Sequence, residues 1–323
     1  PAALIASIVT LAYTWSGGIL AVTLTDAVQY VIIVIGVTLC AYLAIDHLGG
    51  FDAMMSILYS NPRFETNMKP LANWSLVQFL GLFFSFLLGE FCAPYYIQRY
   101  ASTKSAKDSK NGLLIFGVHW IFFMATTAAI GLASMAIQPD VKPDLAFTNL
   151  IRDILPPGIT GLVFGALLAA VMSTGAAMIN TSAVIYTRDI YNKFINTAAT
   201  QAQLLRQSRL STLVVGGISI GVAIIFQDVF GLMIYMFKLW PSAILPPLMC
   251  GLLWGKISPY AGAPAVIAGG LSFFLWSDKV LGEPFGIPAN LIGIGLNCLT
   301  LFVVHQMMKR RVPSTGIYAP EVL

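Results

Sequence analysis

Residues 161–191 read GLVFGALLAAVMSTGAAMINTSAVIYTRDIY, an apolar run long enough to cross a bilayer as one helix. Small residues recur along it at every fourth position, namely Gly161, Gly165, Ala169, Ser173 and Ala177. In a helix, residues four apart lie on the same face, so this face carries only small side chains. The run therefore predicts a membrane span over about 158–187 whose small face a neighbouring helix can approach closely.

Three oxygen atoms come together within this run. Ala170, Ser173 and Thr174 stand at positions i, i+3 and i+4, which places two hydroxyls beside one main-chain carbonyl whose second lone pair is expected to be free. Such hard, uncharged ligands suit a weakly held monovalent cation better than a divalent one. The alternative is that both hydroxyls bond back to carbonyls one turn earlier, while the small face packs on another helix. The spacing alone leaves both interpretations open.

The composition of the chain is that of a protein with several membrane spans. Of its 323 residues, 57% are hydrophobic and only 10% are charged, whereas soluble domains carry about a quarter charged residues. The net charge of +4 comes from basic residues in short loops rather than one patch, so nucleic acid is not an expected partner. The four cysteines lack the spacing of a zinc site or a disulfide framework. No catalytic constellation is present, and we do not expect an enzyme.

Apolar runs divide the chain into about nine spans. Residues 2–46 are apolar for far longer than the roughly 20 residues that one span needs, and Ser16-Gly17-Gly18 is the expected break between two helices. The other spans are expected at about 75–97, 112–137, 158–187, 210–226, 229–254, 259–277 and 286–306. Two loops contain short amphipathic stretches that predict interfacial helices, FDAMMSILY at 51–59 and a second around 146–151.

Basic residues are distributed unevenly between the two sets of loops. One set holds Arg99, Lys104, Lys107, Lys110, Arg188, Lys193, Arg206, Arg209, Lys256, Lys309, Arg310 and Arg311, and the other set holds only Arg63, Lys69, Lys142, Arg152 and Lys279. The positive-inside rule places the first set and the C-terminus in the cytoplasm. We expect one transmembrane domain over 1–311 and a C-terminal tail over 312–323, in a bacterial inner membrane.

Three ionisable residues lie in or beside the spans. Asp26 begins the second span, where an acid is most simply a helix cap or a dipole partner. Glu90 and Lys238 lie within the third and seventh spans, and such residues normally face a cavity or one another. A structural pair between them and a substrate role are both open. Prolines predict kinks or openings in these two spans, at Pro94, Pro241, Pro246 and Pro247.

Four blocks of the sequence together resemble the sodium:solute symporter family. They are YTWSGGILAVTLTDAVQ (13–29), YYIQRYASTKSAKDSKNG (95–112), AAVMSTGAAMINTSAVIYTRDIY (169–191) and, less closely, GLLWGKISPYAGAPA (251–265). Their order and separation match the family over nearly the whole chain. The resemblance implies an all-α, LeuT-type bundle of two inverted five-helix repeats. It also implies a secondary transporter that uses sodium entry to drive the uptake of a small organic solute across the lipid bilayer.

The resemblance assigns roles to several residues. The family's A-x-x-S-[ST] element, which supplies half of a sodium site, is here Ala170, Ser173 and Thr174. The acid of the family's T-D-x-x-Q element is Asp26, which the resemblance places on the inner sodium exit path. Some relatives hold a second sodium with hydroxyls three and four residues after the first site serine. This chain has two alanines at those positions, 176 and 177, so we expect one coupled sodium.

The resemblance also bears on the two charges inside the spans. It places this part of the third span beside the substrate cavity, where relatives mostly carry uncharged residues. Glu90 is therefore expected to meet either Lys238 or the cationic group of a cationic or zwitterionic solute such as an amine or amino acid. We favour the solute, because Pro94 one turn later can open the helix toward the cavity.

Compared with the family, the chain begins in the fourth core helix. Pro1 opens inside an apolar run, so we expect the sequence to be the interior of a longer protein whose first three core helices complete the sodium and substrate sites. Two other functional classes share these features. One is a symporter-like sensor module of a signalling protein, and the other is a channel with the same ion ligands and no coupling to a solute.

Overall fold

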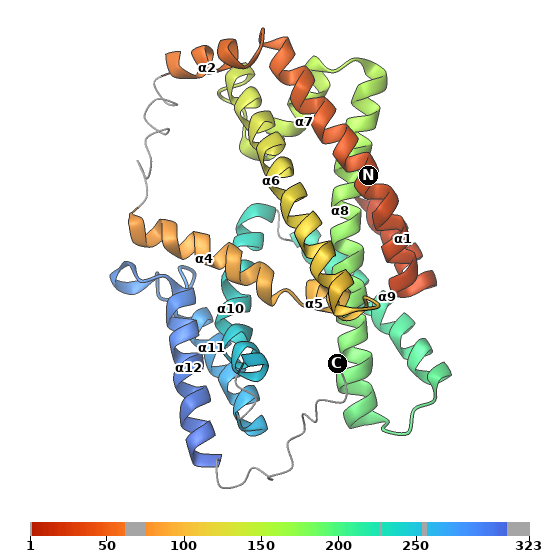
Figure 1. Ribbon diagram of the computed structural model, residues 1–323, viewed down its shortest axis with the longest axis vertical. Helices are drawn as coiled ribbons and strands as arrows, with labels where there is room; N and C mark the ends of the chain where they lie inside the picture. Colours follow the sequence, from red (N-terminus) through yellow and green to blue (C-terminus); the bar gives the residue numbers. More distant parts are fainter. Residues whose placement is uncertain (1, 62–74, 226–227, 254–256, 309–323) are drawn as a thin grey trace. The chain divides into compact units, whose positions relative to one another are not determined.

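The computed structural model describes residues 2–61, 75–225, 228–253 and 257–308, and the described part is helical throughout (Figure 1). The chain forms two compact units, one from residues 1–70 and 98–226 and the other from residues 71–97 and 227–323. The expected tail at 312–323 lies outside the described residues. So do six of the loop charges used above, namely Arg63, Lys69, Lys256, Lys309, Arg310 and Arg311.

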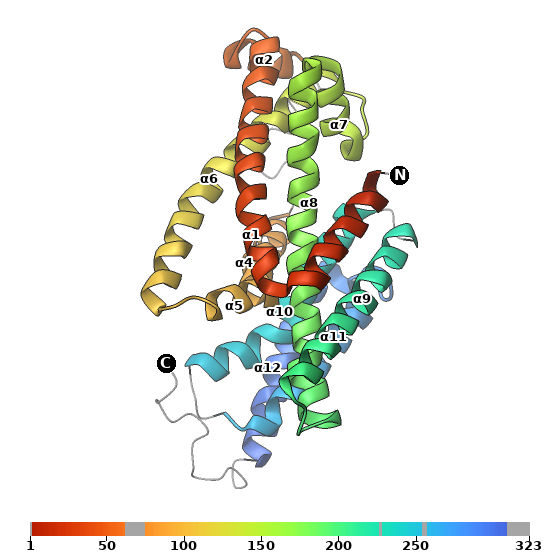
Figure 2. The same cartoon turned by 90° about the vertical axis from the view of Figure 1, so that its right-hand side faces the viewer.

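Seven of the described helices are long and apolar enough to cross a membrane, and the bent pair α4 (Leu76–Cys92) and α5 (Pro94–Ala101) is an eighth candidate. The longest is α1 (Ala2–His47), whose 46 residues rise about 69 Å at 1.5 Å per residue, more than twice the thickness of a bilayer core. Gly18 interrupts it with φ 55° and ψ −144°, a conformation open to glycine. Figure 2 shows the two parts of α1 running in different directions. The predicted break is confirmed, and counting the two parts separately reproduces the nine predicted spans.

The first unit is built on α1, α6 (Ala106–Ile137), α8 (Pro157–Ile185) and α9 (Gln201–Ile225). A π-helix, η1 (Tyr186–Ile195), continues α8. The two short helices α2 (Phe51–Ser60) and α7 (Pro143–Ile154) lie at the same end of α1, α6 and α8 (Figure 1). They form a core there, which buries Cys40, Ala44, Met54, Leu58, Leu150 and Ile151. Both predicted amphipathic helices are therefore present, and each buries its apolar face against the spans.

Helices α1 and α8 pack closely. A Cβ atom added to Gly36 would lie 2.6 Å from the Cβ of Ala166, so α1 has no room there for a side chain. The packed face of α8 differs from the predicted small face, however. Val163 and Ala166 are buried, whereas a Cβ atom added to Gly161 or Gly165 would meet nothing within 4 Å. The expectation that the whole small face packs on a neighbour is wrong at its N-terminal end.

The second unit contains α4, α10 (Val229–Leu253), α11 (Gly262–Trp276) and α12 (Ala289–Met308), with short 3-10 turns at η2 (Pro259–Ala261) and η3 (Pro284–Gly286). Close backbone approaches hold these helices together. A Cβ atom added to Gly269 of α11 would lie 2.1 Å from the carbonyl oxygen of Ser242 in α10. A Cβ atom added to Gly89 of α4 would lie 2.6 Å from the Cδ1 atom of Phe237. Glycine is required at both contacts.

The prolines of α10 do not end the helix, which runs continuously from Val229 to Leu253. Pro246 and Pro247 have no N–H groups, so the carbonyls of Ser242 and Ala243, four residues earlier, lose their helical donors. The buried side chain of Asn297 in α12 replaces them. Its Nδ2 atom donates to the Ser242 oxygen at 2.9 Å and to the Ala243 oxygen at 2.7 Å. A side chain of the neighbouring helix α12 thus supplies donors to the two carbonyls that the prolines leave without one.

Candidate functional site

The oxygen cluster of α8 is formed as the spacing predicts. The Ser173 hydroxyl donates to the Ala170 carbonyl at 3.0 Å, and the Thr174 hydroxyl donates to the same carbonyl at 3.1 Å. The back-bonded arrangement is therefore present, and the Ala170 carbonyl, which also belongs to the helical ladder, has no unused lone pair. Each hydroxyl uses only its hydrogen atom in this bond. The lone pairs of both hydroxyl oxygens stay available to a cation, so the two side chains fit a sodium ion better than the carbonyl does.

The surroundings of the cluster come from α1 as well as α8. Thr174 is exposed and Ser173 is half-buried, so both hydroxyls are accessible in the described part of the chain. The Tyr13 hydroxyl of α1 donates to the carbonyl of Met172 at 3.2 Å and ties the first part of α1 to this turn of α8. The two alanines that follow, 176 and 177, are buried, and their methyl groups offer no oxygen to a second ion.

Asp26 lies well inside α1, eight residues beyond the Gly18 break, so the interpretation as a helix cap is wrong. Its Oδ2 atom forms an ion pair with Nη2 of Arg99 in α5. The Asp26 side chain is only 15% exposed and the Arg99 side chain is 45% exposed. The other carboxylate oxygen, Oδ1, is buried and has no hydrogen-bond partner among the residues that the structure describes. A buried acceptor without a donor is uncommon and marks a place where a cation or water fits.

A second contact joins α5 to α8. The Thr181 hydroxyl donates to Oε1 of Gln98 at 2.5 Å, and Thr181 is buried. Neighbouring residues of α5, Gln98 and Arg99, therefore reach α8 and α1 respectively. The three sequence blocks quoted first as family-like meet through these two contacts. Sequence reasoning counted Arg99 only as a loop charge, although its place in the family-like Y-I-Q-R block was the signal that it had a further role.

Glu90 lies in the last turn of α4, immediately before the helix breaks. α4 ends at Cys92, α5 begins at Pro94, and the two helices are bent by 40°, which confirms the opening predicted at this proline. The Tyr96 hydroxyl donates a hydrogen bond to the Glu90 carboxylate. The Oε2 atom of Glu90 is buried and has no hydrogen-bond partner in the described part of the chain. The acid is therefore only partly satisfied, at a broken helix.

Lys238 does not pair with Glu90, and the structural pair considered from the sequence is wrong. The Nζ atom of Lys238 lies 3.6 Å from Oε1 of Glu283, in the turn before α12. The same Glu283 oxygen accepts the N–H of Ala289 at 3.1 Å, so it also stabilises the N-terminus of α12. Glu283 adopts a left-handed backbone conformation with φ 49°. No sequence signal tied it to Lys238, because the pairing depends on how α10 and α12 pack.

Lys238 lines a cavity with Glu283. The cavity measures about 300 Å³, lies within the second unit, and is lined by Lys238 and Glu283 together with Gln78, Gly81, Leu82, Ile234 and Pro288. Glu90 is not among these residues. The two charges assigned to one substrate cavity are thus separated, and each has its own polar neighbour.

The features that match a known family extend over most of the chain. The model of the sodium:solute symporter family matches residues 1–269. The chain belongs to the sodium:solute symporter family. This membership and the seven apolar helices make it an integral membrane protein, and the matched relatives described next are transporters rather than enzymes.

Two curated relatives illustrate what the chain is similar to. The osmoregulated proline transporter OpuE of Bacillus subtilis is 27% identical over 321 residues, which cover 96% of this chain and 63% of OpuE. The sodium/proline symporter of Escherichia coli is 27% identical over 280 residues, covering 83% of this chain and 55% of that protein. The chain therefore spans somewhat more than half the length of these relatives.

A solved structure of another protein shares the fold. It is the substrate-bound outward-open state of a Na⁺-coupled sialic acid symporter, with a TM-score of 0.69 and 19% sequence identity, and the match covers 95% of this chain and 66% of that one. The all-helical symporter fold predicted from the sequence is confirmed by this match. At this identity the likeness concerns the fold alone.

Proposed function

We propose that the full-length protein is a sodium-coupled symporter that takes up a small organic solute by alternating access. Membership of the sodium:solute symporter family supports the coupling to sodium, and the proline-transporting relatives support a small solute. The observation that carries the proposal is the pair of hydroxyls on α8, Ser173 and Thr174, held side by side with free lone pairs.

In this proposal the two hydroxyls are the sodium ligands that this chain contributes most directly. Each oxygen can ligate the ion while its hydrogen stays on the Ala170 carbonyl, so binding requires no rearrangement of α8. The Ala170 carbonyl becomes a third ligand only when both hydroxyls turn away from it, because the helical N–H already uses one of its two lone pairs. One sodium is expected, because the buried alanines 176 and 177 cannot replace the oxygen ligands of a second site.

Asp26 fits a site that binds sodium briefly as the ion leaves toward the cytoplasm. Its carboxylate is held by Arg99, so a sodium ion that reaches Asp26 competes with a guanidinium that is already in place. The unpartnered Oδ1 atom gives the ion a first point of contact. A site that is half-neutralised in this way favours brief occupancy over tight binding.

The expected solute carries a positive group, either as a cation or as a zwitterion. Glu90 supports this expectation because the buried Oε2 atom of its carboxylate lacks a donor among the described residues and lies next to the α4–α5 break. Lys238 and Glu283 present opposite charges 3.6 Å apart in a separate cavity, where a zwitterion can replace the ion pair with its own two charged groups. The relatives named for proline carry a solute of this class.

The basic loops support a cytoplasmic C-terminus and a bacterial inner membrane as the location. Single cysteines placed in the loops at Lys107 and Lys142 of a cysteine-free variant test the orientation. A membrane-impermeant thiol reagent added to intact cells should label position 142 and leave position 107 unlabelled. Labelling of both positions, or of position 107 alone, contradicts the assignment.

The function itself is tested by uptake into proteoliposomes that contain the full-length protein. A panel of amino acids, amines, sugars and monocarboxylates is added with an inward sodium gradient or with potassium on both sides. We expect saturable, electrogenic uptake of at least one cationic or zwitterionic solute that needs sodium. Sodium current without solute favours the channel, and binding of a solute without uptake favours the sensor module. Equal uptake with and without sodium refutes the proposal.

A further inference from the structure

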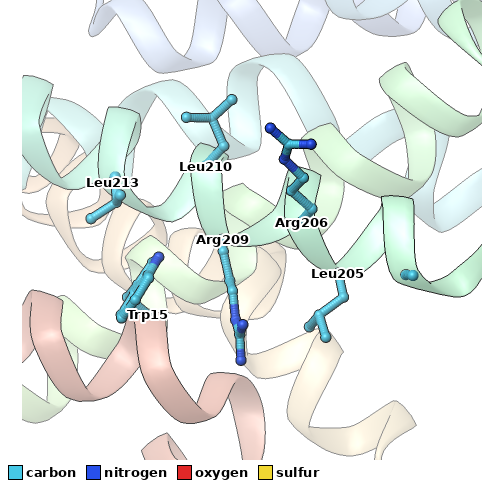
Figure 3. A pocket seen from close by; sticks show the side chains of 7 residues that line it. Trp15, Leu205, Arg206, Arg209, Leu210 and Leu213 are labelled. Carbon is cyan, nitrogen blue, oxygen red and sulfur yellow. The ribbon is translucent and has the colours of Figure 1, made fainter.

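A cavity of about 460 Å³ lies between the first part of α1 and the start of α9, away from the residues discussed above. It is lined by Trp15 of α1 and by six residues of α9, namely Ala202, Leu205, Arg206, Arg209, Leu210 and Leu213 (Figure 3). Both contributing segments belong to the first unit. Trp15 lies three residues before the Gly18 break, and the arginines lie in the first turns of α9, among the basic residues that the positive-inside rule places in the cytoplasm. The cavity is therefore expected at the inner membrane surface.

The two arginines are exposed, and neither has an ion pair with an acid among the described residues. Arg209 lies over the ring of Trp15, with its guanidinium carbon 5.7 Å from the ring centroid. In Figure 3 the Arg209 side chain extends between Trp15 and Leu205, whereas Arg206 extends in the opposite direction, on the side of Leu210. The cavity thus has a positive group at each side, and no carboxylate of the described residues pairs with either one.

The rest of the lining is apolar and open to the surroundings. Leu205 is 55% exposed, Leu210 is 53% exposed, Leu213 is 44% exposed and Trp15 is 42% exposed. On a helix that crosses a membrane, such side chains face lipid chains rather than water. Leu210 and Leu213 lie farther along α9 than the arginines, toward the membrane interior. A ligand that fills this cavity therefore needs an anionic head at the level of the arginines and an apolar body beyond it.

We propose that this cavity binds the headgroup of an anionic phospholipid. Arg209 holds a phosphodiester oxygen beside the Trp15 ring, Arg206 contributes the second positive charge, and an acyl chain follows Leu210 and Leu213. Because Trp15 and the arginines belong to different helices, the bound lipid links the first part of α1 to α9 next to the Gly18 break. An inorganic phosphate shares the same charge chemistry but cannot use the apolar part of the cavity.

The test is native mass spectrometry of the full-length protein with phosphatidylglycerol and phosphatidylcholine of identical acyl chains. We expect phosphatidylglycerol to bind at least about tenfold more tightly, which corresponds to 1.4 kcal/mol. The double variant Arg206→Gln, Arg209→Gln should lose this preference. Arg188→Gln removes one exposed charge from η1, outside the cavity, and this control should retain the preference. Loss of the same size in the control, or retention in the double variant, overturns the proposal.

Two further arms keep the test decisive if the double variant is unstable. Brominated phosphatidylglycerol should quench the fluorescence that is lost in Trp15→Phe, and brominated phosphatidylcholine should not. Equal quenching by the two lipids contradicts the site. Glycerol phosphate or inorganic phosphate at millimolar concentration should leave lipid binding unchanged, and displacement of the lipid by either one assigns the cavity to a soluble phosphate instead. None of these readouts depends on sodium or on uptake, so the symport proposal can fail independently.

Discussion

Replacing Arg99 with Gln should expose how strongly the family-like blocks are held together by the Asp26–Arg99 ion pair. Removing one partner of a fully buried pair costs about 3–5 kcal/mol, whereas exposed pairs contribute at most about 1 kcal/mol. Asp26 is 15% exposed and Arg99 is 45% exposed, which places this pair between the two limits. We expect Arg99→Gln to lower the free energy of unfolding by about 1–3 kcal/mol, because it leaves a largely buried carboxylate without a cation.

The assay is a double-mutant cycle with Asp26→Asn, measured as the free energy of unfolding of the purified protein in an SDS titration. In the double variant no charge is left unpaired, so it should be less destabilised than the sum of the two single variants, with a coupling of about 1–3 kcal/mol. The chain offers a matched control in the same unit. Lys193 and Asp189 form an ion pair at 2.8 Å with side chains 62% and 54% exposed, and their coupling should be about 0.3–0.5 kcal/mol.

Coupling energies of equal size in the two cycles would refute this reasoning, because they would show that burial of Asp26 adds nothing. The same variant has a functional consequence. Without the guanidinium, sodium no longer has a competitor at Asp26, so Arg99→Gln should slow sodium release and lower the maximal uptake rate. An unchanged rate would remove Asp26 from the exit route.

Three other predictions follow from single contacts. Glu90→Gln should raise the half-saturating concentration of a cationic or zwitterionic solute at least about tenfold, because charge-assisted hydrogen bonds contribute about 1.5–3 kcal/mol. Unchanged uptake kinetics would show that Glu90 is only a packing residue. Asn297→Leu should destabilise the protein by about 2–4 kcal/mol because two buried carbonyls lose their donors; the same loss in a variant whose paired prolines are alanines would contradict this cause. Reversal-potential measurements should give one sodium per solute, as expected from Ala176 and Ala177, and a ratio of two would require ligands not recognised here.

The helices were predictable because membrane spans are encoded locally. Apolar length sets the spans, and amphipathic composition located α2 and α7. The break at Gly18 was readable because a glycine pair interrupts an overlong run. At Pro246 and Pro247 local rules do not reveal how the freed carbonyls are satisfied. The helix continues there because Asn297, about fifty residues later, supplies the missing donors, and no local pattern contains that information.

The site was predictable only where its residues are close in sequence. Ser173 and Thr174 lie one turn beyond Ala170, so helical spacing alone brought the three oxygens together. The partners of Asp26 and Lys238 depend on how distant helices pack. The cap interpretation of Asp26 is wrong because its helix begins earlier than the sequence indicates. The partner of Lys238 is not predictable because Glu283 lies in a turn with no distinguishing motif.

The most direct test of the account is the sodium dependence of uptake in the double variant Ser173→Ala, Thr174→Val. Both changes keep the size of the side chain and remove a ligand oxygen, so the half-saturating sodium concentration should rise by at least about tenfold. Thr160→Val is the matched control, because Thr160 lies on the same helix and its hydroxyl is back-bonded to Pro156 at 2.9 Å in the same way. The account predicts that sodium activation is weakened in the double variant and preserved in the control. Unchanged sodium activation in a folded double variant would contradict the proposed site.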